Sequence, residues 1–195
     1  IVSEENKEVP YEKRKDFDYH WLVDPLDGTK EFIKRNGEFT VNIALIHQQR
    51  PVLGIVYVPA TDELFWAVER AGAYSVVNGE IAKLNAYEFR MDDEGLRIVT
   101  SRSHLNDATR AFVDRLRTPT TVARGSSLKF TALARGEADI YPRLGPTMEW
   151  DTGAAQIILE EAGGKVIDEE TGEPLRYNKE NLRNPHFIAY GQVRG

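Results

Sequence analysis

Residues 21–30 place two carboxylates three positions apart where an apolar run ends. Pro25 fixes one backbone angle and lacks an N–H, and Gly28 can adopt backbone conformations closed to other residues. The carboxylates of Asp24 and Asp27, with neighbouring backbone carbonyls, could therefore fold around a cation. Mg²⁺ prefers such oxygen ligands and leaves positions open for water and a substrate phosphate. The spacing is compatible with a magnesium site.

A simpler interpretation gives these two carboxylates a local role. Asp24 and Asp27 could cap a helix expected over 29–34 or shape a β-turn, which are common roles for Asp near Gly. Two other acidic positions favour a metal site instead. Glu4 follows an apolar start, and Asp151 stands immediately before a helical pattern.

Asp151 also has two interpretations. The helix expected over 152–162 ends at Gly163-Gly164, so Asp151 could be its N-cap and accept a backbone N–H. A helix start also attracts anions through its free N–H groups and its dipole, so Gly153 and its neighbours could hold a phosphate beside a metal at Asp151. One residue could serve both purposes.

Further along the chain, cationic and hydroxyl side chains could bind a phosphate. Ser126 and Lys129 stand at the start of an expected helix, and Arg143 follows an expected strand. The simpler role of Ser127 is a plain N-cap, and that of His104 is a place in a solvated turn. Composition alone does not decide between these roles.

The elements that must position these residues follow from apolar periodicity and turn composition. Strands are expected over 20–23, 39–46, 52–58 and 63–68, the last three as an antiparallel meander, with weaker strands over 97–100, 120–123, 138–141 and 186–189. Helices are expected over 107–116, 127–134 and 152–162. The pattern predicts a mixed α/β fold with helices layered on sheet, in one domain over 1–195.

Composition excludes several classes of function. The net charge is −6 and the basic residues are scattered, so polymeric nucleic acid is not an expected partner. The absence of Cys excludes disulfides and thiolate nucleophiles, and it fits the cytoplasm. No run approaches the roughly 18 apolar residues of a membrane span. Composition does not predict the oligomeric state.

Three acidic motifs, Ser3-Glu4-Glu5, 21–29 and Trp150-Asp151-Thr152, together resemble the metal-binding motifs of the inositol monophosphatase superfamily of lithium-sensitive, magnesium-dependent phosphatases. The nucleotidase branch of bacteria hydrolyses 3'-phosphoadenosine 5'-phosphate to AMP and phosphate, which recycles a nucleotide of sulfur assimilation. The segments 24–34, 36–46, 125–130 and 141–151 closely resemble that branch.

The resemblance implies a layered α/β/α/β/α fold and a chain that lacks the family's N-terminal helices. Residues 1–195 would then be one N-terminally truncated phosphatase domain. A small phosphorylated nucleotide would be the substrate. The cytoplasm remains the expected location, with peripheral association with the inner membrane left open.

The resemblance also assigns roles to residues. It implies two or three Mg²⁺ ions. The metal ligands that it implies are Glu4, Asp24, the Leu26 carbonyl, Asp27 and Asp151. Asp24 would bridge two of the ions, Glu4 would bind one of them, and Thr29 would orient the attacking water. The scissile phosphate would contact Gly28 and Thr29. Leu26, Asp27 and Asp151 would also contact the substrate. The nucleotide would be bound by His104, Ser126, Lys129 and Arg143. Lys129 and Arg143 would hold the 5'-phosphate.

Three alternatives stay open at this point. An inositol monophosphatase would use the same carboxylates on a different phosphate ester. A catalytically silent module would bind metal and nucleotide without releasing phosphate. A purely structural α/β domain would use the acidic residues only as caps and turns.

Overall fold

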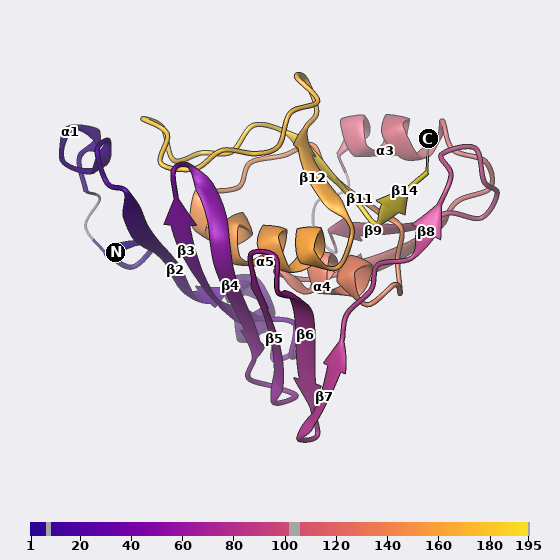
Figure 1. The fold of residues 1–195 in the computed structure, drawn as a ribbon. Coiled ribbons are helices and arrows are strands. Elements are labelled where there is room, and N and C mark those ends of the chain that lie inside the picture. Colours follow the sequence, from indigo (N-terminus) through magenta and orange to yellow (C-terminus); the bar gives the residue numbers. More distant parts are fainter. Residues whose placement is uncertain (7–8, 102–105, 195) are drawn as a thin grey trace.

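The computed structural model describes residues 1–6, 9–101 and 106–194, and it contains two large sheets with helices between them (Figure 1). The seven-stranded sheet follows chain order through β1 (Val2–Ser3), β2 (Tyr19–Asp27), β3 (Thr40–His47), β4 (Arg50–Val58), β5 (Glu63–Val68), β6 (Gly72–Val77) and β7 (Glu80–Lys83). β1 is parallel to β2, and each later neighbour is antiparallel.

The second sheet has a different strand order from its chain order. It runs through β10 (Thr120–Arg124), β9 (Arg97–Ser101), β11 (Ile140–Arg143), β13 (Phe187–Tyr190) and β12 (Lys165–Asp168). A small parallel pair joins β8 (Glu88–Phe89) to β14 (Gln192–Val193). The helices are α1 (Tyr11–Arg14), α2 (Thr29–Ile33), α3 (Asp107–Val113), α4 (Leu128–Ala134) and α5 (Glu149–Glu161).

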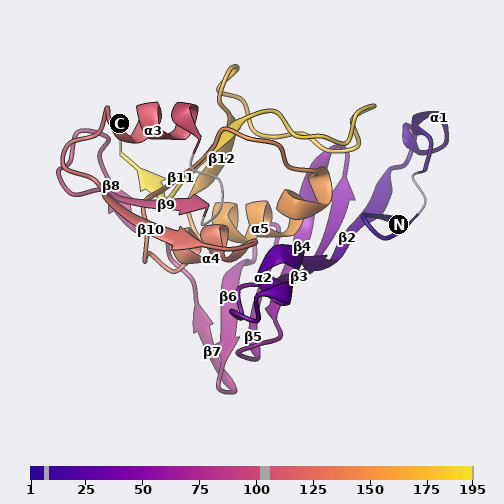
Figure 2. The ribbon, with the colours of Figure 1, turned by 180° about the vertical axis from the view of Figure 1, so that it is seen from behind.

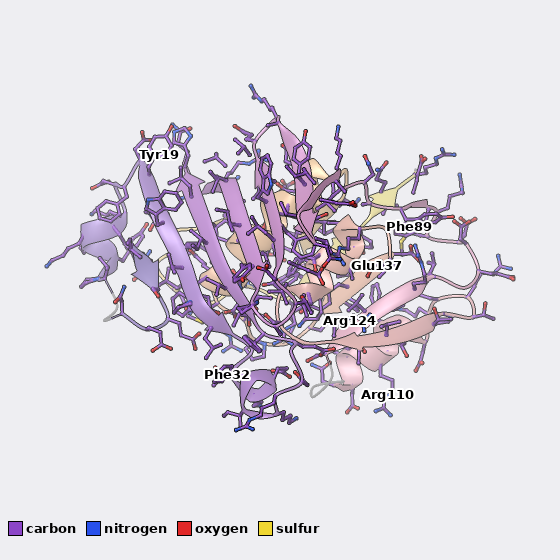
Figure 3. The ribbon with its side chains drawn as sticks, turned by 90° about the horizontal axis from the view of Figure 1, so that it is seen from below. Tyr19, Phe32, Phe89, Arg110, Arg124 and Glu137 are labelled. Atoms are coloured by element: carbon purple, nitrogen blue, oxygen red, sulfur yellow. The ribbon has the colours of Figure 1, made fainter. Side chains whose placement is uncertain are left out.

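One face of the seven-stranded sheet packs against α5. β3 alternates buried and half-buried residues along its whole length, as expected for a strand with one covered face. Ala44, Ile46, Val56 and Phe65 are buried in the main core together with Ile158 of α5. The outer face, seen in Figure 3, keeps large side chains partly exposed, with α2 beyond one end of the sheet.

The second sheet is covered on both faces. Val99, Tyr141 and Phe187 are buried in the main core together with residues of α4 and α5. Their neighbours Ile98 and Ile140 belong instead to a second cluster with Phe112 of α3. The described residues therefore form successive layers of sheet, helix, sheet and helix (Figures 1 and 2).

The mixed α/β fold class expected from the sequence is confirmed, and each expected strand has a counterpart in one of the two sheets. The meander continues beyond the expected strands through β6 and β7. Two helix boundaries were wrong: α3 ends at Val113, and α5 already begins at Glu149. No helix in the described ranges is long and apolar enough to cross a membrane.

Gly54 allows a close approach between the seven-stranded sheet and α5. A Cβ at this position would lie 2.3 Å from the carbonyl oxygen of Ala154 and 2.5 Å from Cγ2 of Ile157. A backbone carbonyl cannot rotate away as a side chain can, so only glycine fits here. The fit places α5 directly against β4.

Replacing Gly54 with Ala should therefore strain this contact. Overpacking a core typically costs about 1–3 kcal/mol, and we expect the free energy of unfolding in urea to fall by about 2 kcal/mol or more. Gly145→Ala is the matched control, because its added Cβ would meet nothing closer than 3.9 Å. An unchanged urea midpoint for Gly54→Ala would contradict the packing described here.

Candidate active site

The two carboxylates of β2 reach the same side of the sheet because the strand is irregular between them. Asp24 pairs with Asn42 and Asp27 pairs with Thr40, so three steps on β2 oppose two steps on β3. The backbone N–H of Leu26 donates to Oδ1 of Asp24 over 2.9 Å, which fixes this bulge. Two acidic side chains thereby face inward near the end of one strand.

Three carboxylates from distant parts of the chain meet beside this bulge. One oxygen each of Glu4, Asp24 and Asp151 lies within 4.8 Å of the other two. Glu4 follows β1, whose parallel pairing with β2 brings it level with Asp24. Asp151 stands in the first turn of α5. Strand pairing and helix packing, rather than sequence proximity, form this cluster.

The charge on the cluster is poorly solvated. Burial, together with the charges of Asp27, Asp151 and Glu4, raises the pKa of Asp24 to about 8. Burial and the charges of Asp27 and Glu4 raise the pKa of Asp151 to about 7, and burial and Glu5 raise the pKa of Glu4. The negative charges therefore require a compensating cation or protons.

Asp24 shows that the donor set fits a hard cation. Its side chain is 1% exposed, and its Oδ2 atom has no hydrogen-bond partner among the described residues. A buried carboxylate oxygen without a hydrogen-bond donor is unfavourable unless a proton or a cation compensates its charge. Carboxylate oxygens are the ligands that Mg²⁺ and Ca²⁺ prefer. The cluster can therefore hold a divalent cation.

Asp27 is held by donors from other elements and lies outside the three-carboxylate group. Its Oδ2 atom accepts hydrogen bonds from the hydroxyls of Ser126 and Ser127, at 2.5 and 3.1 Å. Asn42 donates to the same oxygen over 3.2 Å, and Thr40 does so over 3.4 Å. These bonds tie β2 to β3 and to the start of α4.

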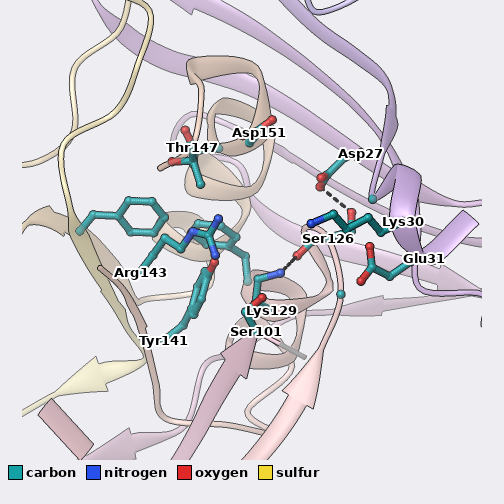
Figure 4. Close-up of a pocket in the computed structure, with 15 residues that line it drawn as sticks. Asp27, Lys30, Glu31, Ser101, Ser126, Lys129, Tyr141, Arg143, Thr147 and Asp151 are labelled. Atoms are coloured by element: carbon teal, nitrogen blue, oxygen red, sulfur yellow. Dashed lines mark hydrogen bonds between the residues drawn. The ribbon is translucent and has the colours of Figure 1, made fainter. Parts of the chain in front are cut away.

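The pocket beside the carboxylates carries positive charge on its opposite wall (Figure 4). Lys129 is 7% exposed, donates to the Ser126 carbonyl and lies over the Tyr141 ring. Burial lowers the pKa of Lys129 to about 8. The guanidinium of Arg143 donates to the Pro146 carbonyl, but its buried Nε has no partner among the described residues. An anion in this pocket could pair with both cations.

The structure brings most of the expected site residues together. The cavity of about 140 Å³ is lined by Asp27, Gly28, Ser126, Lys129, Arg143 and Asp151, among others. Leu26 lies in the bulge of β2, and Thr29 is the first residue of α2. His104 lies outside the described residues.

The local roles considered for these residues are realised only in part. The turn-shaping role fits Asp24, whose Oδ1 accepts the N–H of Leu26 two positions on. α2 begins after Gly28 and has no side-chain cap, so neither Asp24 nor Asp27 caps it. Asp151 is the third residue of α5 rather than its N-cap, and it accepts the Met148 N–H over 2.8 Å. Ser127 stands at the N-cap of α4, but its hydroxyl makes no capping bond.

Thr40 and Asn42 were missed in the sequence. Both are buried on the face of β3 that otherwise carries Ala44 and Ile46. A buried polar side chain requires hydrogen-bond partners, so two polar residues at inward positions of an alternating strand were the available signal. Which carboxylate they serve depends on strand register, which the pattern does not give.

The raised pKa values predict how the metal-free chain responds to pH. Between about pH 4 and 8, Asp24 is ionised in the unfolded chain. In the folded chain Asp24 keeps its proton until about pH 8. Stability should therefore fall as the pH rises through this range. In EDTA at pH 8 we expect Asp24→Asn to raise the free energy of unfolding by about 1 kcal/mol or more.

The comparison at pH 5 and the exposed substitution Asp16→Asn serve as controls. The gain from Asp24→Asn should be smaller at pH 5, and Asp16→Asn should leave the pH dependence of the urea midpoint unchanged. If Asp24→Asn were less stable than the unmutated chain at pH 8, the repulsion described here would be refuted.

Comparison with known proteins places this site in a family. The inositol monophosphatase family model matches residues 1–189. The curated 3'(2'),5'-bisphosphate nucleotidase CysQ of Salmonella typhimurium is 44% identical over 188 residues, which cover 96% of this chain and 74% of the relative. The CysQ of Escherichia coli strain K12 is 43% identical with the same coverage.

Solved structures agree with the sequence comparison. The crystal structure of CysQ from Bacteroides thetaiotaomicron superposes with a TM-score of 0.90 at 42% identity, covering 99% of this chain and 77% of that chain. An inositol monophosphatase from Anabaena superposes with a TM-score of 0.76 at 28% identity, covering 98% of this chain and 73% of that chain. The chain belongs to the inositol monophosphatase family.

Proposed function

We propose that this chain is a magnesium-dependent phosphatase that hydrolyses the 3'-phosphate of 3'-phosphoadenosine 5'-phosphate to give AMP and phosphate. The observation that carries the proposal is a carboxylate cluster that adjoins a cationic pocket, with Asp151 belonging to both. Glu4, Asp24 and Asp151 form a cluster fit for cations, and Lys129 and Arg143 form a positive wall beside it. Relatives named 3'(2'),5'-bisphosphate nucleotidase at 43–44% identity support the same substrate.

The carboxylates would hold the metal ions that this reaction needs. Glu4, Asp24, Asp27, Asp151 and the Leu26 carbonyl are the proposed ligands, for two or three Mg²⁺ ions. Bound Mg²⁺ supplies charge neutralisation at the phosphate and makes an attacking water more acidic. The orphan Oδ2 of Asp24 is consistent with this role.

The other residues would bind and orient the substrate. We place the scissile phosphate against Gly28 and the Thr29 hydroxyl, at the start of α2, where Thr29 would orient the attacking water. Gly28 has φ of +92°, and a Cβ there would lie 3.1 Å from the Glu38 carbonyl oxygen, so other residues would be strained at this position. Ser126 orients Asp27 in this structure, and its backbone carbonyl anchors Lys129.

The positive wall favours a substrate with two phosphates. Lys129 and Arg143 would bind the 5'-phosphate while the 3'-phosphate lies at the carboxylate cluster. An inositol monophosphate has no second phosphate for these cations, so it would leave the Nε atom of Arg143 without a partner. This observation ranks the nucleotide above inositol monophosphate, which remains the second candidate.

The first test is phosphate release from 3'-phosphoadenosine 5'-phosphate in Mg²⁺. We expect turnover by the unmutated chain and a loss of at least about a hundredfold in EDTA or in Asp24→Asn, since metal assistance contributes several kcal/mol. Asp16→Asn is the matched control and should keep full activity. Hydrolysis of inositol monophosphate alone would favour the second candidate, and nucleotide binding without phosphate release would identify a silent module.

The second test addresses substrate choice. Arg143→Ala removes a charge-assisted contact worth about 1.5–3 kcal/mol, so kcat/KM for the bisphosphorylated nucleotide should fall about 10- to 150-fold. Inositol monophosphate hydrolysis should change little, because that substrate does not reach this cation. Arg110→Ala, on the exposed surface of α3, is the control. Equal losses on both substrates would contradict the assignment of Arg143 to the second phosphate.

A further inference from the structure

Glu149 is a second buried acidic residue at the start of α5, two positions before Asp151. Its side chain is fully buried, and its carboxylate accepts the backbone N–H groups of Asn178 and Lys179 over 2.7 and 3.1 Å. The Lys179 ammonium also donates to Oε1 over 2.5 Å. These bonds occupy both oxygens of Glu149, so this residue fixes the helix start rather than offering a metal ligand.

Arg14 is the last residue of α1, and its side chain is also fully buried. Its guanidinium donates to the carbonyls of Val9, Lys179 and Glu180 over 3.1, 2.7 and 2.9 Å. It also donates to Oδ1 of Asn178 over 3.0 Å. Arg14 therefore ties Val9 and the end of α1 to a loop near the other end of the chain.

Asn178 joins these two residues into one network. Its backbone N–H donates to Glu149, and its side-chain amide both accepts from the Arg14 guanidinium and donates to the Arg14 carbonyl over 2.7 Å. Asn178 has φ of +60°, a left-handed conformation that Asn tolerates better than most residues. The network links Arg14 and Asn178, which are 164 positions apart in the sequence.

The geometry points to a role for this network in metal binding: we infer that Arg14 and Glu149 are positioning residues that hold Glu4 and Asp151 at the spacing a divalent cation needs. The inference rests on the proposed metal-dependent function. Arg14 anchors the chain ten positions after Glu4, and Glu149 anchors the helix turn that contains Asp151.

The need for such anchors follows from the cluster itself. Glu4 is exposed and follows β1, a strand of only two residues, so strand pairing alone restrains it weakly. The neighbouring carboxylates repel it, and this repulsion favours a wider spacing when no cation is bound. Mg²⁺ tolerates little departure from octahedral geometry, so a small widening should weaken binding. Residues that support metal ligands typically change affinity 10- to 100-fold when altered.

The test is Mg²⁺ titration by calorimetry on the whole chain, together with the thermal unfolding midpoint. Glu149→Gln removes the charge. It also places an amide nitrogen against N–H groups from which the carboxylate accepts hydrogen bonds. Asp139→Asn is the matched control, because Asp139 is equally buried and accepts the N–H and guanidinium of Arg97 away from the cavity. We expect both variants to unfold at lower temperature, and only Glu149→Gln to weaken Mg²⁺ binding, by about tenfold or more.

Arg14→Lys provides a second route if Glu149→Gln does not fold. Lysine keeps the charge but cannot reach four acceptors in the planar arrangement that Arg uses, so its Mg²⁺ affinity should fall similarly. Unchanged Mg²⁺ affinity in a folded variant of either residue, or an equal loss in Asp139→Asn, would overturn the inference and leave the proposed function intact. An unmutated chain that binds no Mg²⁺ would overturn the metal site and this inference together.

Discussion

Repulsion among closely spaced carboxylates, of which Asp24 is buried, is the constraint around which this structure is arranged. Glu4, Asp24 and Asp151 come within 4.8 Å of one another, and burial makes their charges harder to solvate than on a surface. A folded chain that keeps them together must hold each one from outside the cluster. β1 pairing places Glu4, the β2 bulge fixes Asp24, and the packing of α5 places Asp151. Stability is thereby given up at the carboxylate cluster that, within residues 1–6, 9–101 and 106–194, can bind a cation.

The contact between α5 and the seven-stranded sheet connects packing to this chemistry. Gly54 lets the helix backbone approach β4, and Gly153 has Leu22 and Ala44 within 3.4 Å of the position of a Cβ. Because the helix packs this closely, its first turn lies against the end of β2, with no larger side chain between them. Core packing and the spacing of the carboxylates are therefore two consequences of the same small residues.

The sequence predicted local features well and long-range ones poorly. The strands expected over 39–46, 52–58 and 63–68 and their antiparallel meander are local patterns, and the structure confirms both. The acidic motifs were recognisable because their residue types and order are themselves unusual. Asp151 was placed at the wrong helix position because the helix already begins at Glu149, whose partners lie 29 and 30 positions away. Arg14 was not singled out either, since nothing in a four-residue helix indicates that its guanidinium is buried against carbonyls of a distant loop.

Charge separation at the site accounts for its unrelieved repulsion and supports its proposed selectivity. The carboxylates gather on one side, and Lys129 and Arg143 lie on the other, yet no ion pair in the described residues joins the two groups. Direct pairing would relieve the repulsion and lower the demand for a cation. The hydroxyls of Ser126 and Ser127 instead donate to Asp27, and the Ser126 carbonyl anchors Lys129. Neutral donors thus keep opposite charges apart, so that each remains available to a ligand that carries both a metal-bound phosphate and a second anionic group.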